Sequence, residues 1–472
     1  MVFKGIKESM HKKNKTYRTM VGKIRSEALA YTAGNDVTLD MLLVNADCIA
    51  SAAHVTMLSK LSLGRKLFSV AEKNRIIREL VKIMHEAQRG KFVIKLKDQD
   101  VHLAIERILT KKIGVSAENI HTGRSRNDQI AVDLRLFAKE ELLKTIEELL
   151  ALSSTLLETA KKNRAIPMVG RTHMQPAMPS SVGLWASAYV ETFHDDIALL
   201  RSAYDLNNEC PLGSAAGYGV PLPIDRQETS DLLAFSQPQH NVLHASNSRG
   251  KMESITLFAL SQVMLTLSRL AQDIILFSMP EFDYFTLPPE LCTGSSILPQ
   301  KNNPDILELV RARATSVISF CFTVMELVKG LPAGYSRDLQ ETKEPFLKGF
   351  QLTRSSLRIM TLLLKSLKIN RESLLAGFKP EVFATDYALE RVKKGSSFRK
   401  AFSYLKTHLD ELQPIDPSES ISSRSHLGAA AKLDFNLMTS WIDAEHDFVN
   451  TERKHYFKVI SRLLKVAYPL KD

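Results

Sequence analysis

The stretch from Arg124 to Ile166 contains neither glycine nor proline, and this uninterrupted run constrains the fold more than any other feature of the sequence. Apolar residues recur in it every three to five positions while lysines and glutamates fill the other faces, which is the pattern of an amphipathic helix. One continuous helix of this length would extend about 60 Å, so it needs partners along its whole length. Its apolar positions are Leu134, Phe137, Leu142, Ile146, Leu149, Leu152 and Leu156.

Further stretches repeat this helical pattern along the chain. The stretch at Met252–Met279 is apolar nearly all round, so we expect it to be buried on several sides. Several helices of this length predict a bundle, and β-type alternation is sparse. The sequence therefore predicts an all-α fold with a central bundle of long helices. The other predicted rods are Ser181–Leu206, Pro304–Lys329 and Asp338–Leu367.

The length of 472 residues exceeds what one compact core usually holds, so we expect several domains. The first, at 1–120, is predicted to be an N-terminal helical domain. The long rods and a loop rich in glycine, serine and asparagine form the central bundle domain at 121–369. Shorter helical patterns after about Asn370 predict a small C-terminal helical domain at 370–472.

Composition narrows the class of protein and its partners. The net charge of +11 arises largely from basic residues near the two ends, and no nucleic-acid motif accompanies it, so we expect no specific nucleic-acid partner. No apolar run without interspersed charges is long enough to cross a bilayer, so no membrane partner is expected. The four cysteines are widely scattered, which favours a cytoplasmic location. They are Cys48, Cys210, Cys292 and Cys321.

Two polar segments stand out in the first half of the chain. His121–Gln129, HTGRSRNDQ, opens the longest predicted helix, where arginine forks and a helix N-terminus both suit anions. Its simpler interpretation is a polar helix entry with a cap. Gly170–Ala177, GRTHMQPA, carries a histidine that can move protons near neutral pH, although a lone histidine is more often structural.

Two more polar segments follow in the second half. Thr293–Pro304, TGSSILPQKNNP, is the most specific string, because two serines on a glycine loop precede a lysine and two asparagines at a helix start, as in an anion cradle. A polar surface loop is the simpler interpretation. In Gly334–Lys343, GYSRDLQETK, Gln340 and Lys343 share one helix face, as they also would at an ordinary solvated helix start.

Motifs for metals and organic cofactors are absent from the sequence. It contains no HExxH, no clustered cysteine and histidine, and neither GxGxxG nor GxxxxGK[ST]. The Gly-x-Ser-x-Gly elbow of many hydrolases is also missing. The sequence therefore offers an enzyme without an obvious metal or cofactor.

Taken together, the four polar segments resemble the fumarase/aspartase superfamily and, within it, the argininosuccinate lyases. The string at Thr293–Pro304 matches the superfamily signature at every fixed position except Leu298, where methionine is usual, and this swap nearly conserves volume. The Pro299–Lys301 version of the signature and the strings HTGRSRNDQ and DLQE are typical of the argininosuccinate branch. The resemblance runs in order from about Asp40 to Arg399, most of the chain.

This resemblance implies a reaction and an assembly. The reaction is the β-elimination that splits argininosuccinate, a small-molecule substrate, into L-arginine and fumarate, the last step of arginine biosynthesis. The assembly is a homotetramer whose central bundle is built from the long helices of four subunits. The active sites would then be shared between three subunits, which accounts for rods that are both long and apolar.

The resemblance also assigns roles to single residues. Ser295 is the expected base that removes the carbon-bound proton, and Lys301 is the expected stabiliser of the carbanion. His173, oriented by Glu308, is the expected acid for the departing guanidine. The expected substrate-binding residues are Asn127, Thr172, Asn303, Tyr335, Gln340 and Lys343. No metal or cofactor is implied.

The sequence departs from the pattern of this family near the N-terminus and in one loop. The Trp-Gly-Gly-Arg-Phe stretch of many members is missing, and Asp36 stands where many members bind substrate with a serine. Gly250 follows Arg249 where aspartate is common. The alternatives left open are another succinyl-compound lyase, such as an adenylosuccinate lyase, a non-catalytic crystallin-like relative, and a nucleic-acid binder suggested only by charge.

Overall fold

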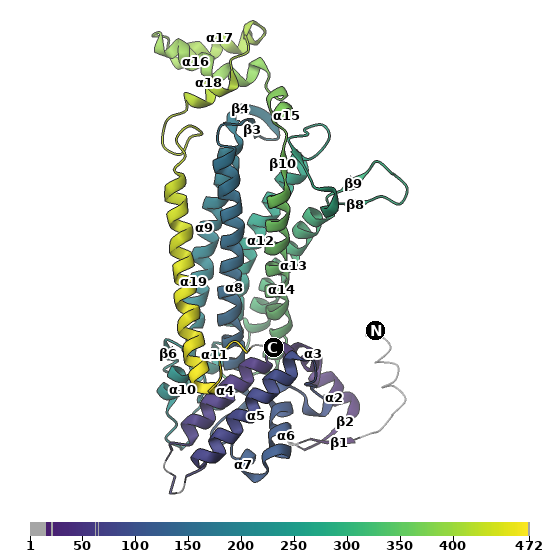
Figure 1. The fold of residues 1–472 in the computed structure, drawn as a ribbon, viewed down its shortest axis with the longest axis vertical. Coiled ribbons are helices and arrows are strands. Elements are labelled where there is room, and N and C mark those ends of the chain that lie inside the picture. The colour runs from purple at the N-terminus through teal and green to yellow at the C-terminus, as the bar shows by residue number, and fades with distance from the viewer. Residues whose placement is uncertain (1–15, 20–21, 62, 65, 471–472) are drawn as a thin grey trace.

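The computed structural model describes residues 16–19, 22–61, 63–64 and 66–470, and long helices dominate it. Five rods lie side by side as an elongated bundle, with a sixth along one face (Figure 1). The predicted all-α class and the long-helix bundle are therefore confirmed. The rods are α8 (Arg126–Lys162), α9 (Val182–Asn207), α12 (Lys251–Phe277), α13 (Asp305–Val328), α14 (Lys343–Ser366) and α19 (Phe435–Leu464).

The longest rod, α8, begins at a well-formed cap. The Ser125 hydroxyl accepts a hydrogen bond from the backbone N–H of Asn127 (3.2 Å), and the Ser125 N–H donates to the Asp128 carboxylate (2.9 Å). These bonds satisfy two backbone groups that a helix start leaves unpaired. With 37 residues, α8 extends about 55 Å at about 1.5 Å per residue. Helix α8 thus fixes the distance between the segment that precedes it and the strands that follow it.

Helix α12 forms the centre of the bundle. Leu257, Leu260, Val263 and Leu267 are fully buried against the neighbouring rods, so the predicted burial on several sides is confirmed. By length and composition α12 would also suit a membrane span, but 61% of its most apolar window is buried inside the protein. That burial is the pattern of a core helix in a helical bundle.

The N-terminal region packs at one end of the bundle, beside the start of α8 (Figure 1). Its helix α4 is almost wholly buried and joins the main core. The basic residues Lys4, Lys7, Lys12, Lys13 and Lys15 lie outside the described residues. The elements here are β1 (Thr16–Thr19), β2 (Gly22–Arg25), α2 (Ser26–Ala33), α3 (Asp36–Leu39), η1 (Asp40–Leu42), α4 (Val44–Leu58), α5 (Val70–Gln88), η2 (Leu96–Asp98), α6 (Val101–Ile113) and α7 (Val115–Glu118).

The opposite end of the bundle carries a β-hairpin and a group of short helices (Figure 1). The hairpin strands pair antiparallel, with an irregularity in register at Gly170 and Arg171. These elements are β3 (Pro167–Thr172), β4 (Gln175–Ser181), α15 (Arg371–Ala376), η5 (Pro380–Phe383), α16 (Ala384–Lys393), α17 (Phe398–Thr407), η6 (Leu409–Glu411) and α18 (Pro417–Ser422).

Short elements connect the rods, and the strands of the described residues pair only two at a time. The pair β8–β9 is antiparallel and carries a loop that projects from the side of the bundle (Figure 1). The connecting elements are β5 (Glu209–Cys210), α10 (Arg226–Leu232), β6 (Gln237–Pro238), α11 (Val242–Asn247), β7 (Phe285–Thr286), η3 (Pro289–Leu291), β8 (Thr293–Gly294), β9 (Asn302–Asn303), η4 (Arg337–Gln340) and β10 (Lys368–Ile369).

The C-terminal helix α19 returns along the bundle and packs against α8 and α9 (Figure 1). Arg453 forms two hydrogen bonds with Glu147 of α8 (2.8 and 2.6 Å). Tyr204 of α9 donates to Glu452 (2.7 Å). The range 370–472 therefore supplies both the short helices at the far end and one rod of the bundle, and the division into three domains stays a prediction.

Candidate active site

A small polar pocket of about 100 Å³, here called the basal pocket, lies where the N-terminal region meets the start of α8 and α14. Four of the six residues predicted to bind substrate line it: Asn127, Tyr335, Gln340 and Lys343. They come from two segments separated by about two hundred positions in the chain, so the tertiary structure brings these two sequence motifs together. The other lining residues are Asp36, Asp100, Arg126, Ile130, Arg249 and Arg337.

Lys343 is the most deeply buried charge of the basal pocket, with a side chain that is 1% exposed. Its ammonium group donates to Asp40 Oδ1 (2.7 Å) and lies 3.0 Å from Asp36 Oδ2. Burial acts to lower the pKa of Lys343, but the two carboxylates outweigh burial and hold this pKa above its ordinary value. The lysine therefore stays charged at neutral pH.

In the two aspartates, the effect of burial on the pKa outweighs the effect of the opposite charge. Burial raises the pKa of Asp40 to about 6, against the attraction of the Lys343 ammonium group. Burial also raises the pKa of Asp36, and Lys343 again opposes the rise. Asp40 Oδ2 is held by the backbone N–H of Val101 at 3.2 Å, which ties this carboxylate to the start of α6.

Two arginines of the basal pocket are held by neighbouring carboxylates. Arg126 Nε donates to Asp100 (2.9 Å), whose other oxygen caps α6 through the N–H of Leu103 (2.9 Å). Arg249 Nε donates to Glu253 (3.1 Å) within the first turn of α12. Both guanidinium groups are thus fixed in place before a ligand arrives, as a preorganised anion site requires.

Gly250, one of the departures from the family pattern, has a structural reason in this chain. Its φ is +75°, a backbone conformation that residues with a Cβ rarely adopt. A Cβ at this position would lie 2.2 Å from Cγ1 of Val328 at the end of α13. The tight start of α12 against α13 therefore requires glycine here.

The second predicted set, Thr172 and His173, lies at the tip of the β3–β4 hairpin. His173 and Met174 both have positive φ (52° and 64°), and their side chains are exposed. Arg171 supports the turn, because its guanidinium donates to the Met174 carbonyl (3.2 Å) and stacks on Phe282 at 4.6 Å. The tight turn thus presents Thr172 and His173 outward from the bundle.

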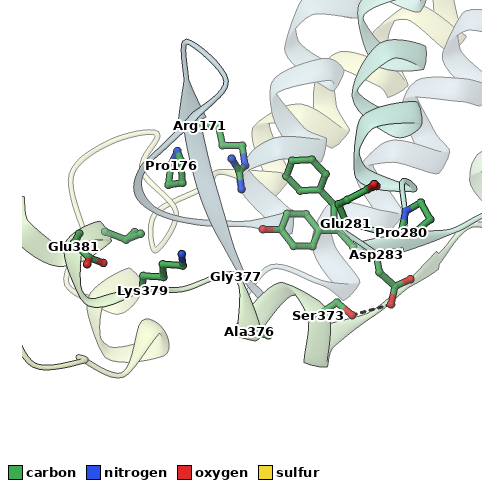
Figure 2. A pocket seen from close by; sticks show the side chains of 13 residues that line it. Arg171, Pro176, Pro280, Glu281, Asp283, Ser373, Ala376, Gly377, Lys379 and Glu381 are labelled. Atoms are coloured by element: carbon green, nitrogen blue, oxygen red, sulfur yellow. Dashed lines mark hydrogen bonds between the residues drawn. The ribbon is translucent and has the colours of Figure 1, made fainter.

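A wider pocket of about 620 Å³ lies beside this hairpin, and Figure 2 shows the side chains that line it. Arg171 and Lys379 contribute positive charge to it, and Glu281, Asp283 and Glu381 contribute negative charge. None of the residues that the sequence singled out for catalysis or substrate binding lines this pocket. It is a neighbour of the hairpin rather than the predicted site.

The third predicted set lies on the projecting β8–β9 loop, here called the signature loop (293–304). The Ser295 hydroxyl accepts hydrogen bonds from the backbone N–H groups of Leu298 (3.1 Å) and Ile297 (3.3 Å). Lys301 is exposed on the same loop, and Asn303 is half-buried at its base. Glu308 follows in the first turn of α13, where its side chain faces solvent.

One chain does not assemble these three sets into a single site. Asn127 lies at the start of α8, while the hairpin with His173 follows its end (Figure 1). A rod of about 55 Å separates them, far beyond the reach of any side chain. The basal pocket and the hairpin therefore cannot contact the same small molecule within one chain.

A buried polar network beneath the segment 121–129 was not anticipated from the sequence. Asp47 and His102 are joined at 3.0 Å, and His102 Nε2 lies 3.3 Å from His121 Nδ1. Burial and the guanidinium of Arg124 lower the pKa of His121 to about 4. One member of this network, His121, lies in the string HTGRSRNDQ that the sequence singles out. The network anchors the turn at His121 that leads into α8, whose first turn carries Asn127.

The same network contains the one group of potential metal ligands found among the described residues. Ligand atoms of His102, Glu106 and His121 lie within 4.8 Å of one another. The buried Arg124 guanidinium carries positive charge close to them and opposes a further cation there. The Arg124 guanidinium donates hydrogen bonds to Ser51 and Gln129, so Arg124 helps to support the start of α8.

Comparison with known proteins identifies the class first. Residues 27–319 match the family described as lyase. The fold is similar to an EDDS lyase in complex with formate (22% identity, TM-score 0.77, covering 93% of this chain and 95% of that one) and to the class II fumarase of Schistosoma mansoni (19%, 0.67, 86% and 98%). With the long-helix bundle and the signature loop, these findings define a lyase of the fumarase/aspartase superfamily.

Sequence relatives narrow the class. The chain is 41% identical to an argininosuccinate lyase of Thermotoga neapolitana, over 80% of this chain and 94% of that one. It is 38% identical to an argininosuccinate lyase of Sorangium cellulosum, over 89% and 97%. An argininosuccinate lyase of Parabacteroides distasonis is 37% identical over 87% and 91%. The chain belongs to the argininosuccinate lyase family.

Proposed function

We propose that this protein cleaves argininosuccinate into L-arginine and fumarate by β-elimination, the last step of arginine biosynthesis. The observation that carries the proposal is the basal pocket, in which Asn127, Tyr335, Gln340 and Lys343 of two family motifs converge. Amide, phenol and ammonium groups of this kind suit the carboxylates and amino group of an amino-acid substrate. Membership of the argininosuccinate lyase family supports the choice of substrate.

The reaction needs a base for a weakly acidic carbon-bound proton. We assign this role to Ser295, which acts through its oxygen once the hydroxyl is deprotonated. The N–H groups of Ile297 and Leu298 already point at that oxygen and would stabilise its negative charge. A free serine hydroxyl is a very weak acid, so such donors are what the role requires.

The remaining catalytic roles need groups from other segments. Lys301, six positions after Ser295 on the signature loop, neutralises the doubly charged carboxylate that forms when the proton leaves. His173 returns a proton to the departing guanidine nitrogen, and Glu308 orients its imidazole. Thr172 and Asn303 complete the contacts to the substrate. Thr172, His173, Lys301 and Glu308 are exposed in the single chain and Asn303 is half-buried, so these residues are accessible to a partner subunit.

We propose that the assembly is a homotetramer with each active site shared between three subunits. The 55 Å separation along α8 supports this, because the hairpin of one chain can complete only the basal pocket of another. Large apolar side chains exposed on the bundle rods also support it, since a lone chain would leave them in water. They include Phe258, Leu265, Leu309, Phe322, Met325 and Leu362.

The test of the function is direct. Purified protein is mixed with argininosuccinate, and fumarate is followed by its ultraviolet absorbance, with adenylosuccinate as the competing substrate. We expect fumarate from argininosuccinate only, at a rate that treatment with a metal chelator leaves unchanged. Release of fumarate from adenylosuccinate alone would favour an adenylosuccinate lyase. Release from neither substrate would favour a non-catalytic, crystallin-like relative.

The shared site has its own test. Subunits carrying His173→Asn and subunits carrying Lys343→Met are each expected to be inactive, because every site in either assembly lacks one group. Mixed assemblies should regain part of the activity, since some sites then draw both intact residues from different chains. Mixtures that exchange subunits, shown by mass spectrometry, yet stay inactive would contradict the three-subunit site.

A cytoplasmic location and the division into three domains remain parts of the same proposal.

A further inference from the structure

Asp36, in the wall of the basal pocket, has one carboxylate oxygen paired with Lys343 and one that accepts no hydrogen bond from the described residues. Oδ2 lies 3.0 Å from the Lys343 ammonium group. Among the described residues, no hydrogen bond reaches Oδ1, and this oxygen is not wholly closed off from solvent. The residue is only 7% exposed, so this access is narrow. Because Asp36 lines the basal pocket, this oxygen offers a negatively charged hydrogen-bond acceptor to a ligand bound there.

Asp40 shows by contrast what a purely supporting carboxylate looks like here. Its oxygens are both engaged, one by the Lys343 ammonium group (2.7 Å) and one by the Val101 N–H (3.2 Å), and it is fully buried. Asp40 alone already balances the charge of Lys343. With the carboxylate of Asp36 added, the group formed by Lys343, Asp40 and Asp36 therefore has a net charge of −1 when both aspartates are ionised.

The position of Asp36 indicates which part of a substrate it meets. It lines the basal pocket and also an adjoining open hollow of about 550 Å³, together with Arg337 and Gln340. The proposed reacting groups lie on other segments, so the basal pocket is left to the end of the substrate away from the broken bond. That end of argininosuccinate is an amino-acid head, which carries an ammonium group and a carboxylate.

We propose that Asp36 binds the α-ammonium group of the arginine half of the substrate through Oδ1, and so selects substrates that carry a free amino group there. This inference rests on the proposed function. The pocket then offers a charge for each part of the amino-acid head, with Lys343 for the carboxylate and Asp36 for the ammonium group, at neighbouring positions. A serine at position 36 would offer a neutral oxygen and a weaker bond.

The test compares two substrates in three proteins. The substrates are argininosuccinate and its analogue without the α-amino group, and the proteins are the wild type, Asp36→Asn and Asp338→Asn. Asp338 lines only the adjoining hollow and is exposed, so its variant is the matched control for removing one negative charge. A change that acts through Lys343 would slow both substrates equally, because both keep the carboxylate. The ratio of their kcat/KM values isolates the ammonium contact.

We expect the wild type and Asp338→Asn to prefer the amino-bearing substrate by about 10- to 100-fold, as a charge-assisted hydrogen bond allows. In Asp36→Asn this preference should fall to within about threefold, mainly through a higher KM for argininosuccinate. Asp36→Ser, with its unfolding temperature measured alongside, guards against a folding defect and should show an intermediate preference. An unchanged preference in a folded Asp36→Asn protein overturns the inference. Absence of fumarate release by the wild type would instead overturn the proposed function.

Discussion

Replacing Lys343 by methionine would remove the cation that contacts the two buried carboxylates of Asp36 and Asp40. Methionine nearly preserves the length of the side chain, so the change is mainly one of charge. Asp40 already has a pKa of about 6 in the presence of Lys343, against an ordinary value of 3.8. Without the lysine, the pKa of Asp40 must rise further, because burial is then unopposed by that charge.

The sign of the effect follows from proton linkage. A carboxyl group whose pKa is raised on folding binds its proton more tightly in the folded state, so the folded state weakens as pH rises through the raised pKa. Each further unit by which the pKa of Asp40 rises in the folded state lowers the free energy of unfolding by about 1.4 kcal/mol, at pH values above the raised pKa. A loss of about 3–5 kcal/mol is therefore expected at pH 8, as for a buried pair that has lost one partner. At pH 5, Asp40 is mostly protonated in both proteins, and the loss should be under about 1.5 kcal/mol.

The assay is urea unfolding followed by circular dichroism at pH 5 and pH 8, at one fixed protein concentration because assembly affects stability. Lys348→Met is the control, since Lys348 is 48% exposed and pairs with Glu344 at the surface. It should change the free energy of unfolding by under about 1 kcal/mol at either pH. Equal losses for Lys343→Met at the two pH values would refute the argument from buried carboxylates.

Two other substitutions test the signature loop and the start of α12. Ser295→Ala should lower kcat by at least about 100-fold without changing the unfolding midpoint, because a base is lost from an exposed loop; fumarate release near the wild-type rate would remove Ser295 from the base role. Gly250→Ala should destabilise the protein by about 2–5 kcal/mol, from the positive φ and the contact with Val328 together, as measured by urea unfolding. Gly219→Ala is the matched control, because Gly219 has a φ of +73° and no atom lies within 4 Å of the added Cβ. Its free energy of unfolding should fall by only about 1–2 kcal/mol. Similar losses in the two variants would contradict the role of Val328.

Helix α8 shows how much of the fold the sequence could predict. Its apolar spacing and lack of glycine and proline predicted one long rod, and the structure places the helix at Arg126–Lys162 within the predicted stretch. The hairpin after it was not predicted, because Pro167–Ser181 has no apolar alternation and pairs through a tight turn with positive φ at His173 and Met174. Helix α19 was also not foreseen as a rod of the bundle.

The candidate site shows a similar division between what was and was not predictable. Asn127, Tyr335, Gln340 and Lys343 were assigned from motifs, and they line one pocket. The partners of Lys343 were not predicted, since Asp40 lies 303 positions away in the chain. The network of Asp47, His102 and His121 was missed for the same reason.

The sequence by itself determined the helical rods and the chemical character of four polar segments. Both are local properties, since helical periodicity and motif composition are written into residues a few positions apart. Only the tertiary structure decided that Asp36 and Asp40 share one buried lysine, and that α8 holds the basal pocket and the hairpin about 55 Å apart. Burial, charge pairing and distance depend on how the rods pack, and packing joins residues whose separation along the chain carries no local signal.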